Sequence, residues 1–253
     1  MLSPAVSFFS GRDGVRLAYR EVGEGRPLVL LHGITGDATL WLRDGQAETI
    51  AAHGHRVILP DFRGHGRSAK PQNASAYPLD VLTDDGLALV DHLGLGDYDL
   101  GGYSLGARIV VRMLVRGATP GRAVVGGQGL HEVLGVGGGA GSFLRRAFAG
   151  SETFEPGSPE ELAARRLRSS GEDPVALLHV LDSVVATSAE PLGRIQVPTL
   201  VAVGGNDERV RSVDQLVAAL PRGVAAAVPG DHRTAPATPE FVAAIVDFLA
   251  NDE

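Results

Sequence analysis

Short, nearly continuous apolar runs alternate with longer amphipathic segments along much of the chain. The runs over 27–33, 55–61 and 98–104 each end in turn-forming residues, which is typical of strands buried on both faces of a parallel sheet. The segment over 15–22 instead alternates apolar and polar residues, as a hairpin strand does. These patterns predict one hairpin strand followed by buried parallel strands.

Amphipathic segments between these runs predict helices. In the segment over 36–54, Asp37 is a candidate N-cap, Trp41 and Ile50 belong to an apolar face, and Gly54 is a stop. The same strand and helix alternation predicts further helices over about 79–95, 104–117, 212–221 and 239–249, and further strands over 122–128, 197–207 and 223–232. Right-handed crossovers would place these helices on both faces of one sheet.

The regular alternation stops between residues 131 and 190. This interval holds helical segments and no convincing strand. We therefore expect a core domain formed by 1–130 and 191–253, with a helical cap over 131–190 inserted into it.

Composition limits the function classes. The 253 residues are 44% hydrophobic and 21% charged, and no apolar run is long enough to cross a bilayer, so we expect no membrane partner. The formal net charge of −7 and the lack of a concentrated basic face argue against a nucleic-acid partner. The first residues lack a secretory pattern, so a cytoplasmic location is expected. There is no cysteine, which excludes disulfides and thiolate chemistry.

Ser104 stands between Gly102 and Gly106, where a predicted strand turns into a helix. A sharp strand-to-helix turn of this kind exposes a serine nucleophile and needs small residues on either side of it. The alternative interpretation is a serine that caps the following helix after a glycine-rich strand end. The pattern alone does not decide between the two.

A serine hydroxyl needs a base and an orienting acid to act as a nucleophile at neutral pH. Asp207 ends one predicted strand and His232 ends the last one, so Ser104, Asp207 and His232 each come at the carboxyl end of a strand. Asp207 could instead cap the segment after it. Glu208 and Asp231 are the competing acids, one lying further from the strand and the other too close to the histidine in sequence.

The segment Leu30 to Gly36 follows the first buried strand and reads "LLHGITG". Acyl transfer requires backbone N–H groups aimed at the oxyanion of the tetrahedral intermediate. Ile34 and Leu105 are the candidates for these two donors. The alternative is an ordinary turn after a strand.

Five motifs together resemble the α/β-hydrolase superfamily, in its branch of serine esterases and lipases with a small helical cap. They are "LLHGITG", "PDFRGHGRS" (60–68), "GGYSLGA" (101–107), "GGNDERV" (204–210) and "PGDHR" (229–233). The resemblance implies an α/β fold with an eight-stranded, mostly parallel sheet and a cap inserted after the sixth strand. It also implies that Ser104 is the nucleophile, His232 the base and Asp207 the acid, with the N–H groups of Ile34 and Leu105 as the oxyanion hole. His65, within the second motif, is expected to brace the serine turn rather than to bind a metal.

The expected function is a serine hydrolase that cleaves an ester-type acyl bond of a small molecule, as a carboxylesterase, lactonase or thioesterase does, without cofactor or metal. Trp41 and Tyr103 are expected to line the substrate pocket, together with the apolar cap residues Phe143, Leu162, Leu177, Leu178 and Leu181. For Trp41 and these cap residues the alternative is packing in the core. The arginines over 165–168 are expected to form a solvated helix face. The alternatives are a carbon–carbon bond hydrolase or a non-hydrolytic member of the fold, such as a lyase, cyclase, cofactor-free oxygenase or ligand receptor.

Overall fold

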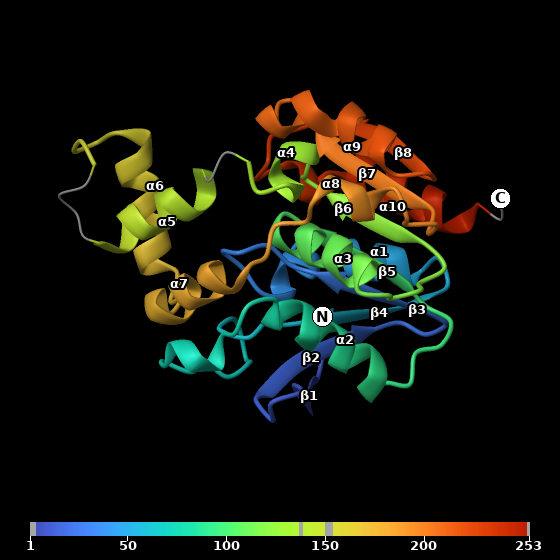
Figure 1. Ribbon diagram of the computed structural model, residues 1–253, viewed down its shortest axis with the longest axis horizontal. Helices are drawn as coiled ribbons and strands as arrows, with labels where there is room; N and C mark the ends of the chain where they lie inside the picture. Colours follow the sequence, from blue (N-terminus) through green and yellow to red (C-terminus); the bar gives the residue numbers. More distant parts are fainter. Residues whose placement is uncertain (1–3, 137–138, 150–153, 252–253) are drawn as a thin grey trace.

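A twisted sheet of eight strands forms the centre of the computed structural model, which describes residues 4–136, 139–149 and 154–251 (Figure 1). The strand order is β1-β2-β4-β3-β5-β6-β7-β8. The strands are β1 (Val6–Ser10), β2 (Arg16–Val22), β3 (Arg26–Leu31), β4 (His55–Pro60), β5 (Asp99–Tyr103), β6 (Ala123–Gly126), β7 (Thr199–Gly204) and β8 (Gly223–Val228).

The sheet is parallel from β4 to β8, as the nearly continuous apolar runs predict. Strand β3 lies between β4 and β5, with Leu28 opposite both Val57 and Asp99. Strand β2 pairs antiparallel with both β1 and β4. The eight-stranded, mostly parallel sheet is therefore confirmed. The periodicity analysis did not identify β1, a five-residue edge strand whose one partner in the sheet is β2.

Helices cover both faces of the sheet. On one face β3 contributes Leu28 and Leu30 to a core shared with α1 and α10, and on the other it contributes Val29 and Leu31 to a core shared with α2, α3 and α9. This alternation follows from the period of two along a strand. The helices of the two covering layers are α1 (Gln46–Ala51), α10 (Pro239–Ala250), α2 (Val81–His92), α3 (Leu105–Val115) and α9 (Val213–Ala219).

The segment predicted as one helix over 36–54 divides into a 3-10 turn, η1 (Ala38–Trp41), and the short helix α1. Asp37 is the N-cap of η1 and accepts a hydrogen bond from the N–H of Thr39, as expected. The 3-10 turn ends at Trp41, and Gly45 is the N-cap of α1 at a φ of 78°, a backbone conformation that suits glycine. The remaining 3-10 turns are η2 (Ala74–Ala76), η4 (Glu208–Ser212) and η5 (Ala235–Ala237).

Between β6 and β7 the described chain is helical. Helices α5 (Gly139–Ala149), α6 (Pro159–Ser169) and α7 (Pro174–Ser183) project to one side of the sheet (Figure 1). A small apolar cluster of its own, including Leu144, Phe154 and Leu167, joins α5 to α6. Helix α4 (Leu130–Val133) packs instead on α3 and α9, and α8 (Ala189–Leu192) adds Leu192 to the main core. Part of the predicted cap interval, 137–138 and 150–153, lies outside the described residues.

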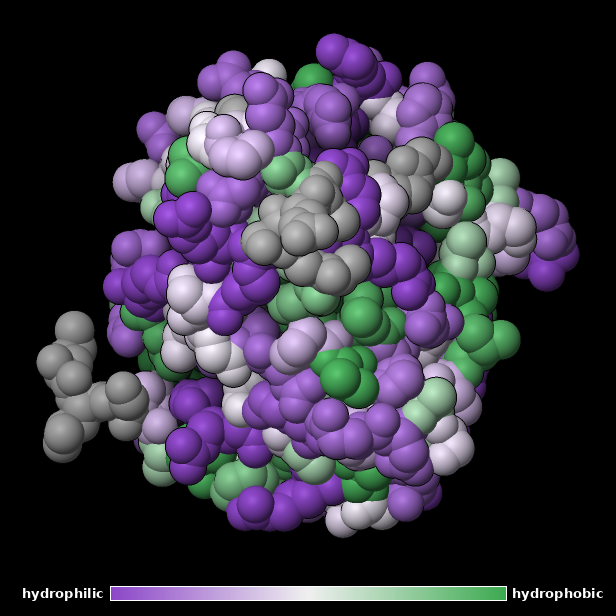
Figure 2. Space-filling view, turned by 90° about the vertical axis from the view of Figure 1, so that its left-hand side faces the viewer, coloured by the Kyte–Doolittle hydropathy of each residue, from purple (hydrophilic) through white to green (hydrophobic). Residues whose placement is uncertain are grey.

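The face on the side of α5 to α7 is mainly hydrophilic, with hydrophobic side chains in small areas (Figure 2). Of the predicted arginine face, Arg165 forms an ion pair with Glu161 one turn earlier, and Arg168 donates to the carbonyl of Ala147 in α5. These arginines therefore hold α6 together and attach it to α5. No helix in the described part of the chain is long and apolar enough to cross a membrane.

Candidate active site

Ser104 occupies a strained turn between β5 and α3. Its φ of 56° and ψ of −116° are unusual for a residue with a Cβ, and its N–H donates to the carbonyl of Gly126 at 2.9 Å. Although Ser104 is at the N-cap position of α3, its side chain makes no capping hydrogen bond. The hydroxyl is therefore available to groups outside the helix.

Gly102 and Gly106 allow this turn to pack against the sheet. A Cβ on Gly102 would lie 2.5 Å from the carbonyl carbon of Gly106, and a Cβ on Gly106 would lie 2.4 Å from the carbonyl oxygen of Leu31. Both distances are shorter than any side chain tolerates against backbone. The two glycines are thus required by the close approach of α3 to β5 and β3, which is the reason for the small residues expected on either side of Ser104.

His232 and Asp207 lie next to Ser104 at the carboxyl edge of the sheet. The Nε2 atom of His232 is 2.9 Å from Ser104 Oγ, and its Nδ1 atom is 2.7 Å from Asp207 Oδ2. Because a carboxylate only accepts, the neutral histidine donates from Nδ1 to Asp207 and accepts the Ser104 hydroxyl proton at Nε2. The three side chains form a continuous hydrogen-bonded chain.

Asp207 is buried, and its two oxygens have different partners. Burial by itself would raise the pKa of Asp207, but hydrogen bonds from His232 and from the backbone and side chain of Arg209 outweigh it and leave the pKa below its ordinary value. Asp207 therefore stays ionised at neutral pH. The Oδ1 atom accepts from the Arg209 N–H and caps η4, while Oδ2 faces His232. Asp207 therefore both caps η4 and contacts His232, so the two interpretations of this residue are compatible.

Tyr103 and Trp41 lie in the core, although they were expected to line the substrate pocket. Tyr103 points away from the Ser104 side of the strand, its hydroxyl donates to the carbonyl oxygen of His232 at 2.9 Å, and its ring packs on Phe241. Trp41, 1% exposed, stacks on the same Phe241. Successive residues of a strand face opposite sides of the sheet, so the residue before Ser104 faces the α10 side.

The loop after β3 is held close to Ser104 by two buried histidines. His32 accepts from the N–H of Phe62 at Nε2, and His65 places Nε2 2.8 Å from the carbonyl oxygen of Ile34. A Cβ on Gly33 would lie 3.4 Å from Ser104 Cβ. Burial lowers the pKa of both His32 and His65 to about 4, so both rings are neutral near pH 7. Within the described residues, no cluster of His, Cys, Asp or Glu side chains is arranged to hold a metal.

A cavity of about 640 Å³ opens over the Ser104 side of the sheet. Ile34, Ser104 and Leu105 line it from the core, and Phe143 and Leu181 line it from α5 and α7. Among the apolar cap residues expected at the pocket, Phe143 and Leu181 are therefore present, whereas Leu162 is 43% exposed and absent from the lining. The cavity lies between the catalytic edge of the sheet and the projecting helices.

The cavity also has polar walls that the motif analysis did not single out. Arg108, Gln128 and Arg209 line it, together with the acidic Glu132 and Glu208. Arg108 follows Ser104 by four residues, a spacing that places two side chains on the same side of a helix, so helical periodicity was the available signal. Gln128 lies in the loop after β6, the strand that neighbours β5.

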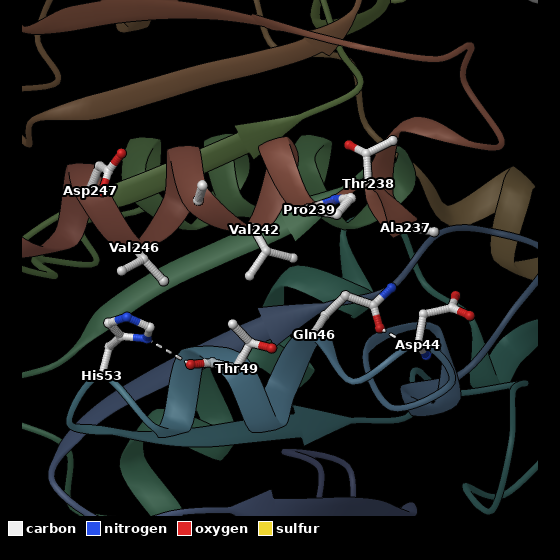
Figure 3. A pocket seen from close by; sticks show the side chains of 11 residues that line it. Asp44, Gln46, Thr49, His53, Ala237, Thr238, Pro239, Val242, Val246 and Asp247 are labelled. Carbon is white, nitrogen blue, oxygen red and sulfur yellow. Dashed lines mark hydrogen bonds between the residues drawn. The ribbon is translucent and has the colours of Figure 1, made fainter.

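A second, smaller cavity of about 280 Å³ lies between α1 and α10 (Figure 3). Thr49 and His53 face Val242 and Val246 across it. His53 is already bonded to the backbone carbonyl of Thr49. None of Ser104, Asp207 and His232 lines this cavity, whereas Ser104 lines the larger one.

Comparison with known proteins agrees with this architecture. A family model described as the alpha/beta hydrolase fold matches residues 26–126, from β3 to β6. The enol-lactonase from Burkholderia xenovorans LB400 superposes with a TM-score of 0.77 over 97% of this chain and 100% of that chain, at 21% identity. The chain has the α/β-hydrolase fold.

Curated relatives match less than half of this chain. A non-heme haloperoxidase from Rhodococcus erythropolis is 38% identical over 109 residues, which are 43% of this chain and 38% of the relative. An epoxide hydrolase from Caballeronia sordidicola is 37% identical over 95 residues, 38% of this chain and 28% of the relative. The match thus spans less than two fifths of the length of either relative. The names of these two relatives denote different reactions.

Proposed function

We propose that this protein is a serine hydrolase that cleaves an ester-type acyl bond of a small molecule. The observation that carries the proposal is the hydrogen-bonded chain from Ser104 Oγ through His232 to Asp207, with distances of 2.9 and 2.7 Å. This order of nucleophile, base and orienting acid is what acyl transfer by a serine requires. The 640 Å³ cavity beside Ser104 has the volume of a small-molecule site.

The first chemical step is attack of Ser104 Oγ on the acyl carbonyl carbon. His232 Nε2 takes the hydroxyl proton as the new carbon–oxygen bond forms, and ionised Asp207 stabilises the resulting imidazolium. His232 then gives the proton to the departing alkoxide as the ester bond breaks, leaving an acyl-enzyme. Water, deprotonated by the same histidine, attacks the acyl-enzyme, and Ser104 recovers its proton as the carboxylic acid leaves.

The backbone N–H groups of Ile34 and Leu105 are the oxyanion donors of this proposal. Both residues line the cavity beside Ser104, and neither N–H donates to another group in the part of the chain that the structure describes. The first N–H groups of a helix have no partner within it, which leaves Leu105 free to donate. His65 supports the other donor by holding the carbonyl of Ile34. Two such donors stabilise the developing negative charge on the carbonyl oxygen.

The proposal is tested by fluorophosphonate labelling together with turnover of p-nitrophenyl butyrate, a lactone, a thioester and a vinylogous diketone. Ser104→Ala should abolish labelling and reduce ester turnover by about 10⁴-fold or more, and His232→Ala should also remove turnover. Ser7→Ala, an exposed serine of β1, is the matched control and should retain both. Labelling that persists in Ser104→Ala would refute the nucleophile. Selective cleavage of the diketone would favour a carbon–carbon hydrolase, and ligand binding without turnover would favour a non-hydrolytic role.

A further inference from the structure

Arg108 is a charged residue next to the nucleophile that the reaction described above does not use. It lies in α3, one turn after Ser104, and its N–H donates to the carbonyl oxygen of Ser104 at 3.3 Å. Both residues line the 640 Å³ cavity. A ligand in this cavity can therefore contact the Arg108 side chain and the Ser104 hydroxyl at the same time.

The other two arginines of this cavity are already neutralised by carboxylates. Arg145 forms an ion pair with Asp182, and Arg209 forms one with Asp207 at 3.0 Å. Arg108 has no carboxylate within ion-pair distance in residues 4–136, 139–149 and 154–251, and its buried Nε atom has no hydrogen-bond partner there.

The acidic residues of the cavity do not replace such a partner. Glu132 raises the pKa of Arg108 through its charge but forms no ion pair with it among the described residues. The Glu132 carboxylate instead accepts a hydrogen bond from the N–H of Gly129 at the start of α4. Glu208 is exposed to solvent at the start of η4. Burial of Arg108 lowers its pKa from the ordinary value despite the nearby Glu132. The site thus has a partly buried positive charge without an ion-pair partner among the described residues.

Gln128 adds a second unsatisfied group to the same wall. It is 3% exposed, and its side-chain oxygen has no hydrogen-bond partner among the described residues. Buried polar atoms without partners are destabilising, and charged ones more so. A ligand carboxylate would accept from the Arg108 guanidinium. It would also accept from the Gln128 NH₂ group once rotation of the amide exchanges that nitrogen with the unpartnered oxygen, since a carboxylate cannot donate to the oxygen itself.

We propose that Arg108, assisted by Gln128, binds a carboxylate on the acyl chain of the substrate, so that the preferred substrates are monoesters of short dicarboxylic acids. The inference rests on the proposed hydrolysis at Ser104 for the identity of the cleaved bond. Hydrogen bonds to a charged partner are worth about 1.5–3 kcal/mol, which corresponds to roughly a 10- to 150-fold difference in affinity.

The test compares p-nitrophenyl hydrogen glutarate with p-nitrophenyl pentanoate, which has an acyl chain of equal length without the charge. The protein should prefer the glutarate ester in kcat/KM. Arg108→Gln should lower kcat/KM for the glutarate ester by about 10- to 100-fold, mainly by raising KM. The same substitution should change kcat/KM for the pentanoate ester less than threefold. Arg108→Lys should recover part of the loss. Arg222→Gln, which removes the same charge just before β8 at the opposite edge of the sheet, is the control and should change neither ester.

Calorimetric binding of glutarate itself gives a readout that does not depend on turnover. The native protein should bind glutarate at least tenfold more tightly than Arg108→Gln, with thermal melting used to confirm that both are folded. Equal losses for the two esters, or glutarate binding unchanged by Arg108→Gln, would overturn the anion site. If no ester is cleaved but glutarate binding still depends on Arg108, the proposed hydrolysis fails and the anion site stands.

Discussion

The hydrogen bond from Tyr103 to the backbone of His232 connects the hydrophobic core to the catalytic histidine of the proposal. Tyr103→Phe removes the hydroxyl that donates to the His232 carbonyl oxygen at 2.9 Å and leaves the ring in contact with Phe241. Losing one partner of a partly buried hydrogen bond costs about 1–2 kcal/mol. In a protein of this size each kcal/mol corresponds to about 2–4 °C in Tm, so Tm should fall by roughly 2–8 °C.

The same substitution should lower activity through the position of His232. With its carbonyl released, the loop that bears His232 loses an anchor on the core, and the imidazole spends less time aligned with Ser104. We expect kcat to fall by about 3- to 10-fold while KM for a neutral ester changes less than twofold, because the cavity lining is unaltered.

Tyr77→Phe is the matched control for this experiment. Tyr77 is 5% exposed, and its hydroxyl has no hydrogen-bond partner among the described residues, so its removal should leave Tm equal or higher. The measurements are thermal unfolding by circular dichroism and steady-state ester hydrolysis for both variants. If Tyr103→Phe matches Tyr77→Phe in both Tm and kcat, the hydroxyl does not anchor His232 and the reasoning is wrong.

Three further predictions concern backbone packing and ionisation. Gly106→Ala should destabilise the protein by about 2 kcal/mol or more in urea unfolding, because its Cβ meets the backbone of β3, whereas Gly36→Ala, with open space around it, should be neutral. Burial and the nearby Asp37 raise the pKa of Glu172 to about 7, so its proton stabilises the fold below pH 7 and that contribution declines as pH rises from about 4.5 to 7. Glu172→Gln should therefore match the native protein at pH 4.5 and exceed it by up to about 1 kcal/mol at pH 8, the figure being reduced for solvent screening; equal stability at pH 8 would contradict this. His32 and His65, with pKa values lowered to about 4, stabilise the fold fully above pH 6.5 and lose about 2 kcal/mol each by pH 5, so His65→Gln should flatten the fall in unfolding free energy between pH 7.5 and 5.

The strand pattern was largely readable from the chain because buried parallel strands need unbroken apolar runs. Each of the seven predicted strands overlaps an observed strand, and the first strand, β1, was missed. Helix ends were less exact, since one predicted helix is interrupted at Gly45. The pattern of apolar residues over 36–54 is compatible with one helix or with two shorter elements. Which of these forms depends on how η1 and α1 each pack on the sheet.

The candidate site was partly predictable for a related reason. Ser104, Asp207 and His232 stood out because each follows a strand, and the carboxyl ends of parallel strands meet at one edge. The pocket walls did not follow in the same way. Trp41 and Tyr103 were expected at the pocket but lie in the core, whereas Arg108 and Gln128 line it. Which face of the sheet a residue points to depends on strand register, and a glycine-rich strand end shows no apolar alternation from which to read it.

The sequence by itself determined the class of fold, the order of the chemical groups along the chain and the glycines that the serine turn requires. These are properties of local spacing. The tertiary structure alone decided that Ser104 Oγ lies 2.9 Å from a histidine 128 residues away, that Asp207 divides its oxygens between a cap and that histidine, and that Arg108 faces the same cavity without an ion pair. Such relations depend on how strands far apart in the chain are aligned and on how side chains fill the space between them. The spacing of apolar residues along the chain determines neither the alignment nor the packing.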